Sequence, residues 1–394
     1  MAGALDGIKV LDFSRLLPFE YCTMMLADLG AEVLKVEEPE KGDYMRWLPP
    51  KNKKEGYIFL LANRNKKSMT LNFNTEKGRE IVYRLVKKYD VLFESFRPGI
   101  MDGFGLGYKD LKEINPRLVY CSSTGYGQTG PYKDKAGHDA NYIAVAGILG
   151  VTGRHTGAPV IPGIPIADMS IGIFSAYAIL AGLMARDRTG KGQHIDVSMT
   201  DCMVSYNTIP LAHHFAGYEY GIGESSGSLE ITGHALWYNC FETRDGKYLF
   251  LGNLEKKFWI NLCKAIGRED FVDFEFATGK KRDEIMAEMR SIFLTKSREE
   301  WLEIMGGKDF CASPVNSLEE VVADPQVNAR EMILETDHPV EGTIKQIGFP
   351  YKFSETPGKI KTPPPVLGQH TNEVLANFGY TEDDIRDLEE KGIV

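Results

Sequence analysis

The chain has 394 residues, of which 43% are hydrophobic and 26% are charged, and its formal net charge at pH 7 is −9. This composition is typical of globular proteins, and the length favours two domains. The acidic balance argues against nucleic acid as a partner, because a surface that binds phosphate backbones carries excess positive charge. Six scattered cysteines without a C-x-x-C pair predict reduced thiols and no metal site, and the N-terminal residues lack a signal-peptide pattern, so we expect a cytoplasmic protein.

The first half of the chain alternates strand-like and helix-like segments. This alternation predicts an α/β fold with a doubly wound parallel sheet. A further segment, 169–185, is almost wholly apolar. It is short for a membrane span and contains two serines, so we interpret it as a buried core helix and expect no membrane partner. The predicted strands are 8–13, 32–36, 68–71, 91–96 and 118–122, and the predicted helices between them include 19–29 and 75–88.

A glycine-rich motif with G-x-G-x-x-G spacing occurs at residues 125–130. In dinucleotide-binding sheets, this spacing follows the first strand and opens an apolar helix. Here Pro131 and a polar stretch follow the motif, and the loop after the first strand contains no glycine. We therefore interpret the motif as a loop and expect neither NAD nor FAD.

The pattern changes after about residue 205. Strand-like segments at 237–241 and 248–251 flank a turn sequence, which predicts an antiparallel pair, and helical segments follow. A smaller α+β domain is therefore expected beside the large one. The predicted division is a large domain over 1–205, a linker over 206–229, the small domain over 230–325, and a C-terminal segment over 326–394 that packs on the large domain.

The stretch Gly137-His138-Asp139, with Asp168 further along, is the most informative pattern for chemistry. His138 and Asp168 both lie where a helix is predicted to begin. Histidine exchanges protons near neutral pH, and the positive field at a helix start keeps a carboxylate ionised. Two such groups could flank one carbon and move a proton between its faces. Each residue could instead be a simple helix cap, a position that Asp in particular favours.

Other charged residues are candidates for ligand contacts. Glu255 follows a predicted strand, and a surface carboxylate is the simpler interpretation. Arg97 falls at the carboxyl end of a predicted parallel strand, where such sheets bind ligands, and arginine suits phosphate groups. The run Arg64-Asn65-Lys66-Lys67 is either a phosphate-binding segment or a solvated charge run.

Several segments, in chain order, resemble the class III coenzyme A (CoA) transferase family, which includes the α-methylacyl-CoA racemases. The resemblance covers nearly the whole chain. It implies an acyl-CoA thioester as substrate, no prosthetic group and no metal ion. It also implies an interlocked homodimer, with the active site between the large domain of one chain and the small domain of the other. The similar segments are 5–12, 26–37, 63–68, 94–99, 125–131 and 365–371.

The resemblance also implies roles for individual residues. In the transferases, the residue that matches Asp168 is a nucleophile that forms acyl-aspartyl and aspartyl-CoA intermediates. In the racemases, the same Asp pairs with the His of a Gly-His-Asp motif, here His138 and Asp139, and a Glu that matches Glu255 orients the imidazole. CoA contacts are implied for Arg64, Lys66, Lys67, Leu71, Asn72, Ser95, Arg97 and Gly137.

Because Gly137-His138-Asp139 resembles the racemase form, our first expectation is an isomerase. It would invert the α-carbon of a 2-methylacyl-CoA by two-base proton transfer through an enolate. Backbone N–H groups at the two helix starts would stabilise the enolate oxygen. The first alternative is a CoA transferase that moves CoA between a thioester and a carboxylic acid through covalent Asp168. The second is a non-catalytic acyl-CoA-binding protein, which would not need His138, Asp168 and Glu255 together.

Overall fold

The computed structural model describes residues 3–153, 158–217, 230–307 and 309–394. The chain forms two compact units. The first comprises Met1–Ala146, Gly163–Tyr206 and Gln326–Val394, and the second comprises Gly147–Pro162 and Asn207–Pro325. Residues 147–162 thus group with the second unit, which the sequence did not indicate. The predicted linker over 206–229 contains a helix, and its residues 218–229 lie outside the described part of the chain.

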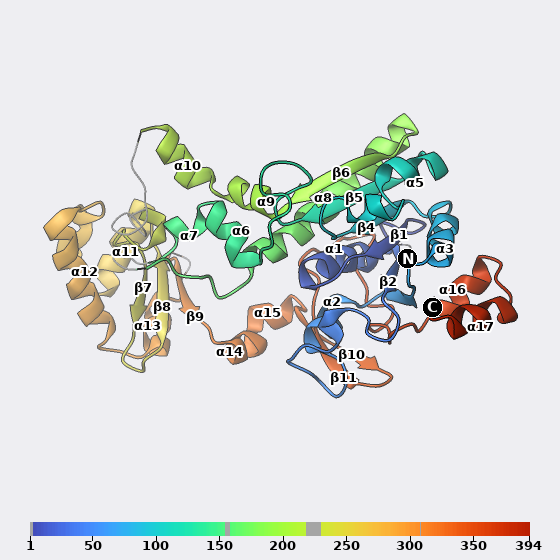
Figure 1. Cartoon of the computed structure of the whole chain (residues 1–394). Helices are drawn as coiled ribbons and strands as arrows, with labels where there is room; N and C mark the ends of the chain where they lie inside the picture. Colours follow the sequence, from blue (N-terminus) through green and yellow to red (C-terminus); the bar gives the residue numbers. More distant parts are fainter. Residues whose placement is uncertain (1–2, 154–157, 218–229, 308) are drawn as a thin grey trace. The chain divides into compact units, whose positions relative to one another are not determined.

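The first unit is built on a parallel sheet (Figure 1). This sheet has six strands in the order β3-β2-β1-β4-β5-β6. The predicted parallel sheet is therefore confirmed. The order reverses between β1 and β4, and open α/β sheets bind ligands outside the carboxyl ends of their strands at such a point. The strands are β1 (Lys9–Phe13), β2 (Glu32–Glu37), β3 (Lys66–Thr70), β4 (Val91–Glu94), β5 (Val119–Thr124) and β6 (Gln193–Ser198).

The five predicted strands appear within a few residues of their expected bounds, but β6 was not predicted. Its first half is exposed, because β6 is the edge of the sheet and pairs with β5 alone. The inner strands read as continuous apolar runs because both faces of a parallel sheet are covered by helices. Leu11, Leu34 and Leu92, for example, are fully buried on adjacent strands.

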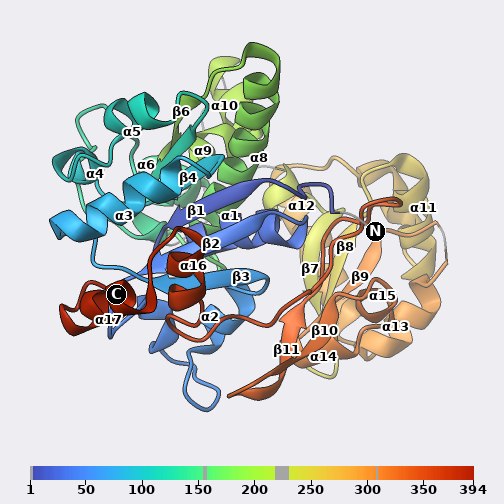
Figure 2. The same ribbon diagram turned by 90° about the vertical axis from the view of Figure 1, so that its right-hand side faces the viewer.

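Helices cover the sheet of the first unit, and the C-terminal segment returns to it. Helix α16 lies beside β3 (Figure 2), where Thr70 N–H donates to Thr371 Oγ1 at 3.0 Å. The main helices are α1 (Leu17–Asp28), α3 (Glu76–Val86), α5 (Tyr108–Ile114), α8 (Ile166–Thr189), α9 (Met199–Tyr206), α16 (Thr371–Asn377) and α17 (Glu382–Glu390). Shorter elements are α2 (Tyr57–Ala62), α4 (Ile100–Gly103), α6 (Asp139–Val145) and the hairpin β10 (Ile333–His338) and β11 (Gly342–Ile347).

The predicted core helix is α8, which packs most extensively against α1. Among the described helices, α8 alone is long and apolar enough to cross a membrane, and half of its most apolar window is buried within the protein. Gly172, in the second turn of α8, allows this helix to approach the start of α1, since a Cβ atom there would lie 2.7 Å from the carbonyl oxygen of Pro18. This close packing fixes the start of α8, where Asp168 lies.

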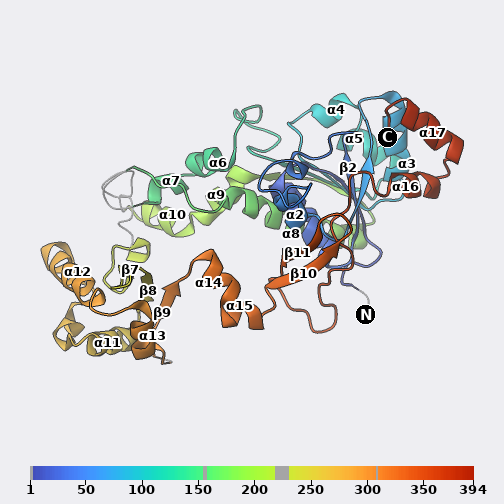
Figure 3. The ribbon, with the colours of Figure 1, turned by 90° about the horizontal axis from the view of Figure 1, so that it is seen from below.

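The second unit contains a three-stranded antiparallel sheet in the order β7-β8-β9, with helices gathered around it (Figure 3). The predicted antiparallel pair and its turn are confirmed. Trp237, Trp259 and Phe293 are fully buried in its core. The elements are β7 (Tyr238–Glu242), β8 (Tyr248–Gly252), β9 (Ala312–Val315), α7 (Ile148–Val151), α10 (Thr208–Phe215), α11 (Lys256–Ala265), α12 (Gly279–Phe293), α13 (Arg298–Met305) and α14 (Leu318–Ala323), and α15 (Pro325–Ala329) follows at the return to the first unit.

Candidate functional site

His138 and Asp168 both lie at helix starts in the first unit, as predicted. His138 is the N-cap of α6, and its backbone N–H donates to Asn141 Oδ1 at 3.0 Å. Asp168 is not the N-cap of α8, as the sequence had suggested, but lies within its first turn after the cap residue Pro165. The helix begins earlier because proline is tolerated at a helix start and the residues between Pro165 and Asp168 carry no stop signal.

Asp139 connects the two helix starts. Its Oδ1 atom accepts hydrogen bonds from the backbone N–H groups of Ala167 at 2.7 Å and Asp168 at 3.2 Å. The Asp139 side chain therefore positions the first turn of α8. It also occupies two of the backbone donors that we had expected to stabilise an enolate oxygen. For these two N–H groups the expectation is wrong, because they already have a carboxylate acceptor.

The surroundings of Asp168 make its carboxylate unusually basic. Burial and, to a smaller extent, the negative charge of Asp139 raise its pKa to about 6, and the charge of His138 opposes this shift. At neutral pH the group is still mostly ionised. A carboxylate with a raised pKa is a better base and a better nucleophile than an exposed one, because both properties increase with proton affinity.

Tyr142 ties the Gly137 segment to this site. Its hydroxyl donates to the carbonyl oxygen of Gly137 at 2.6 Å, and a Cβ atom at Gly125 or Gly137 would lie under 3.0 Å from its ring. Burial raises the pKa of the Tyr142 hydroxyl to about 12, with a contribution from Asp168 that Arg97 opposes. Tyr142 is thus within electrostatic reach of both residues. The first glycine of the 125–130 motif has this packing role, and no pyrophosphate site is needed to explain it.

The point where the strand order reverses carries another group of candidate residues. Ser95 Oγ accepts a hydrogen bond from Arg15 N–H at 3.1 Å, which joins the loops after β1 and β4. The Arg15 guanidinium lies 5.4 Å from the ring centroid of Phe96, and the next residue, Arg97, is exposed. Ser95 and Arg97 therefore lie at the expected edge of the sheet. Sequence reasoning missed Arg15, which no motif distinguishes.

The basic run at 64–67 was predicted to be either a phosphate-binding segment or a solvated charge run, and two of its side chains match neither prediction. Arg64 is buried and pairs with Asp28 at 2.7 Å. Lys66 is also buried, and its Nζ donates to the carbonyl oxygen of Glu20 and to Asn63 Oδ1, each at 2.9 Å. These two side chains hold the first unit together and are neither a solvated charge run nor an exposed phosphate site.

The remaining predicted CoA contacts in this region are Lys67, Leu71 and Asn72. Lys67 is partly exposed and pairs with Glu373 at 2.8 Å. Leu71 is buried, and Asn72 donates its backbone N–H to the carbonyl oxygen of Ile393 at 2.7 Å. Contact of residues 64–72 with CoA stays a prediction.

Glu255 belongs to the second unit, where it is the exposed N-cap of α11. His138 belongs to the first unit, so the predicted orientation of its imidazole by Glu255 stays a prediction. No group of three or more His, Cys, Asp or Glu side chains in the described ranges is arranged to hold a metal ion.

Comparison with known proteins identifies the family. The family model described as CoA-transferase family III matches residues 5–371, and the chain belongs to this family. A protein named acyl-CoA transferase from Fusarium pseudograminearum is 40% identical over 100% of this chain and 88% of its own length. Human succinyl-CoA:glutarate CoA-transferase is 36% identical over 99% of this chain and 90% of its own length. The structure of a CAIB/BAIF family protein from Brucella suis is 34% identical, has a TM-score of 0.82, and aligns with 96% of this chain and 100% of that one.

These findings confirm the family resemblance, its fold and an enzyme that uses a CoA thioester as substrate. They do not single out the racemase branch, because both of these named relatives are transferases. Our first expectation of an isomerase is therefore less well supported than the transferase alternative.

Proposed function

We propose that the protein transfers CoA between an acyl-CoA thioester and a carboxylic acid, with Asp168 as the nucleophile. The observation that carries this proposal is the state of Asp168. Its carboxyl group is partly buried and has a pKa of about 6, and the backbone that carries it is held by hydrogen bonds from the N–H groups of Ala167 and Asp168 to Asp139. Membership of CoA-transferase family III and the names of the relatives support this assignment.

The proposed reaction has four balanced steps. The Asp168 carboxylate attacks the thioester carbonyl, which forms an acyl-aspartyl anhydride and releases the CoA thiolate. The thiolate then attacks the aspartyl carbonyl, which forms an aspartyl-CoA thioester and releases the donor acid. An acceptor carboxylate attacks this thioester, which forms a second acyl-aspartyl anhydride and again releases the CoA thiolate. Attack of the thiolate on the new acyl group finally produces the product thioester and regenerates Asp168.

The residues around Asp168 have separate tasks in this scheme. Asp139 would hold the aspartyl group in place through the backbone of α8 while its carbonyl is attacked. Arg97, exposed near the end of β4, would bind a phosphate of CoA, as arginine geometry favours. The phosphates of CoA are remote from its thioester, so this contact would support binding of CoA more than the chemical steps.

We further propose a short dicarboxylic acid as the acceptor. The human relative is named for the exchange of CoA between succinyl and glutarate groups, both derived from dicarboxylic acids. The identity of this relative, at 36% over nearly the whole chain, supports a similar class of acid here.

Exchange of CoA between succinyl-CoA and glutarate tests the proposal directly. The wild-type protein should form glutaryl-CoA, and hydroxylamine should trap Asp168 as a covalent derivative visible by mass spectrometry. Asp168→Asn should reduce turnover by about 10³ or more, because the amide is a very poor nucleophile. It should still fold, since Asn also tolerates a helix start. Turnover of a folded Asp168→Asn variant at near wild-type rate would rule out the covalent mechanism.

A second candidate function is the inversion of a 2-methylacyl-CoA, and one observation favours it. The charge of His138 acts on Asp168, which places two groups capable of proton transfer in one site. In deuterated buffer without an acid acceptor, an isomerase would incorporate deuterium at the α-carbon. His138→Ala would then slow that exchange by about 10²–10⁴, the usual effect of losing a general base. Robust CoA exchange that survives His138→Ala, without α-deuteration, excludes this candidate.

A further inference from the structure

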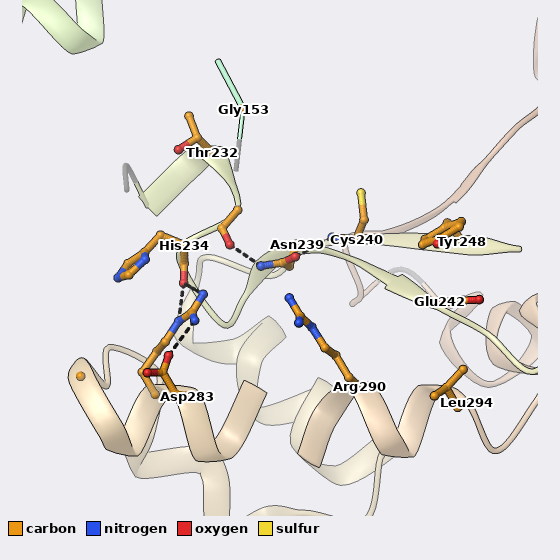
Figure 4. Close-up of a pocket in the computed structure, with 13 residues that line it drawn as sticks. Gly153, Thr232, His234, Asn239, Cys240, Glu242, Tyr248, Asp283, Arg290 and Leu294 are labelled. Carbon is orange, nitrogen blue, oxygen red and sulfur yellow. Dashed lines mark hydrogen bonds and ion pairs between the residues drawn. The ribbon is translucent and has the colours of Figure 1, made fainter. Parts of the chain in front are cut away.

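The second unit contains a hollow of about 750 Å³ between strand β7 and helix α12 (Figure 4). Pockets for small molecules fall mostly in the range of about 300–1,000 Å³. Among the described strands, β7 pairs with β8 alone, and Asn239, Cys240 and Glu242 of β7 line this hollow. None of its lining residues belongs to the first unit.

Arg290 of α12 is the main cationic group available in this hollow. The neighbouring Arg282 is already engaged, since it donates to the carbonyl oxygen of His234 at 2.6 Å and pairs with Asp283 at 2.9 Å. Arg290 is exposed, and its guanidinium forms no hydrogen bond or ion pair with the residues that the structure describes. Its side chain points from α12 towards Asn239 on β7 (Figure 4). The other described arginines of the second unit, all with a carboxylate partner, are Arg244, Arg268, Arg282 and Arg298.

The other walls restrict what could bind beside Arg290. The side chain of Asn239 is engaged locally, with its amide group donating to Gly233 and its oxygen accepting from Cys240 N–H. Tyr248 and Leu294 are 44% and 47% exposed and provide apolar surface. Glu242 adds a negative charge to the same lining, which disfavours a ligand with several negative charges.

We propose that this hollow binds a small carboxylic acid, whose carboxylate pairs with Arg290 and whose apolar part lies against Tyr248 and Leu294. A guanidinium matches a carboxylate with two parallel hydrogen bonds, which makes such pairs both strong and directional. Among the described lining residues, Arg290 is the arginine without a partner and Glu242 adds a negative charge, so the site suits a single negative charge better than the dianion of phosphate. The inference rests on the second unit alone and is independent of the proposed function.

Calorimetric titration with butyrate, glutarate and inorganic phosphate tests the inference. The Asp168→Asn protein serves as the background, because no acyl-enzyme can form in it. Butyrate should bind saturably, and Arg290→Gln should weaken this binding by about tenfold or more, as expected for loss of a charge-assisted pair. Arg290→Lys should retain part of the affinity. Lys264→Gln removes the same charge from an exposed position on α11 and should leave butyrate binding unchanged.

Two results of these titrations would contradict the inference. Butyrate binding that is absent, or equal in Arg290→Gln and the background, overturns the site itself. Phosphate binding that is tighter than butyrate binding and depends on Arg290 overturns the assignment to carboxylic acids. Because Arg290 is exposed and its guanidinium has no described partner, Arg290→Gln and Arg290→Lys should unfold close to the wild-type temperature. Arg290→Glu offers a further variant with the opposite charge, and it should unfold at a slightly lower temperature, because a negative charge in the last turn of α12 opposes the helix dipole.

Discussion

At Asp168, burial and a neighbouring negative charge act in the same direction. Both disfavour the ionised form and so raise the pKa of the carboxyl group to about 6. The nearby carboxylate is Asp139, which also holds the backbone of the same turn by accepting two N–H groups. One side chain therefore controls both the position and the basicity of the proposed nucleophile.

Asp139→Asn separates these two effects. The Asn oxygen can still accept from Ala167 and Asp168, but the negative charge is lost. Since Asp168 must be ionised to attack, kcat/KM of the wild-type enzyme should rise with pH through about 6 and then level off. Removal of a like charge lowers the pKa of Asp168, so the rise should move to lower pH, while the plateau changes by less than about tenfold. A rise that stays in place, measured over the same buffers, would show that Asp139 does not influence Asp168.

Among the elements, the pair α1 and α8 decides where the site lies. The first turn of α8 carries Asp168, and Gly172 in the next turn allows backbone contact with Pro18 at the start of α1. The start of α8, which carries Asp168, therefore lies close to the start of α1, the helix that follows β1 in the chain. Packing of α8, rather than any loop, fixes this arrangement.

Gly172→Ala should therefore affect both stability and turnover. The added methyl group would lie 2.7 Å from a backbone oxygen, so one helix must shift. Overpacking of this kind typically lowers the free energy of unfolding by about 1–3 kcal/mol. Turnover should fall as well, because the shift displaces Asp168. Gly163→Ala is the matched control, since its Cβ would meet no atom within 4 Å, and urea titrations together with CoA-exchange rates would compare the two. Equal values for both variants would contradict the packing argument.

At the scale of the whole molecule, helix α8 carries an exposed apolar stripe. Ile173, Tyr177 and Met184 are 49%, 70% and 68% exposed and lie at helical spacing on the first unit. Clusters of large exposed apolar side chains commonly mark interaction surfaces. The family resemblance implies a homodimer, and we propose that this stripe forms part of its interface.

We expect the protein to be a dimer in light-scattering measurements after size-exclusion chromatography. Tyr177→Asp should weaken the dimer by placing a charge in a dry interface, with a loss of about 1–3 kcal/mol or more in the free energy of association. Leu318→Asp is the control, because Leu318 is 86% exposed on α14 of the second unit. A monomeric wild-type protein, or a dimer insensitive to Tyr177→Asp, would contradict this use of the stripe.

Much of the fold could be predicted from local patterns. The inner strands of the parallel sheet are continuous apolar runs, since they are buried on both faces, and the helix over 75–88 has a regular apolar face. The edge strand β6 was not predicted, because the first half of this strand is exposed to solvent and the strand therefore has no continuous apolar run. The start of α8 was misplaced by a few residues for a related reason, since Ile166 and Ala167 fit a loop or a helix equally well.

The sequence by itself therefore determined the parallel sheet, the antiparallel pair, the family and the candidate residues His138 and Asp168. Only the tertiary structure decided the partners of the charged side chains. It paired Arg64 with Asp28, enclosed Lys66 in the core, and assigned the backbone donors of α8 to Asp139. Periodicity records which face of an element is buried, because burial repeats along the chain. The partner of a charge is set by contacts between residues far apart in sequence, which no local pattern contains.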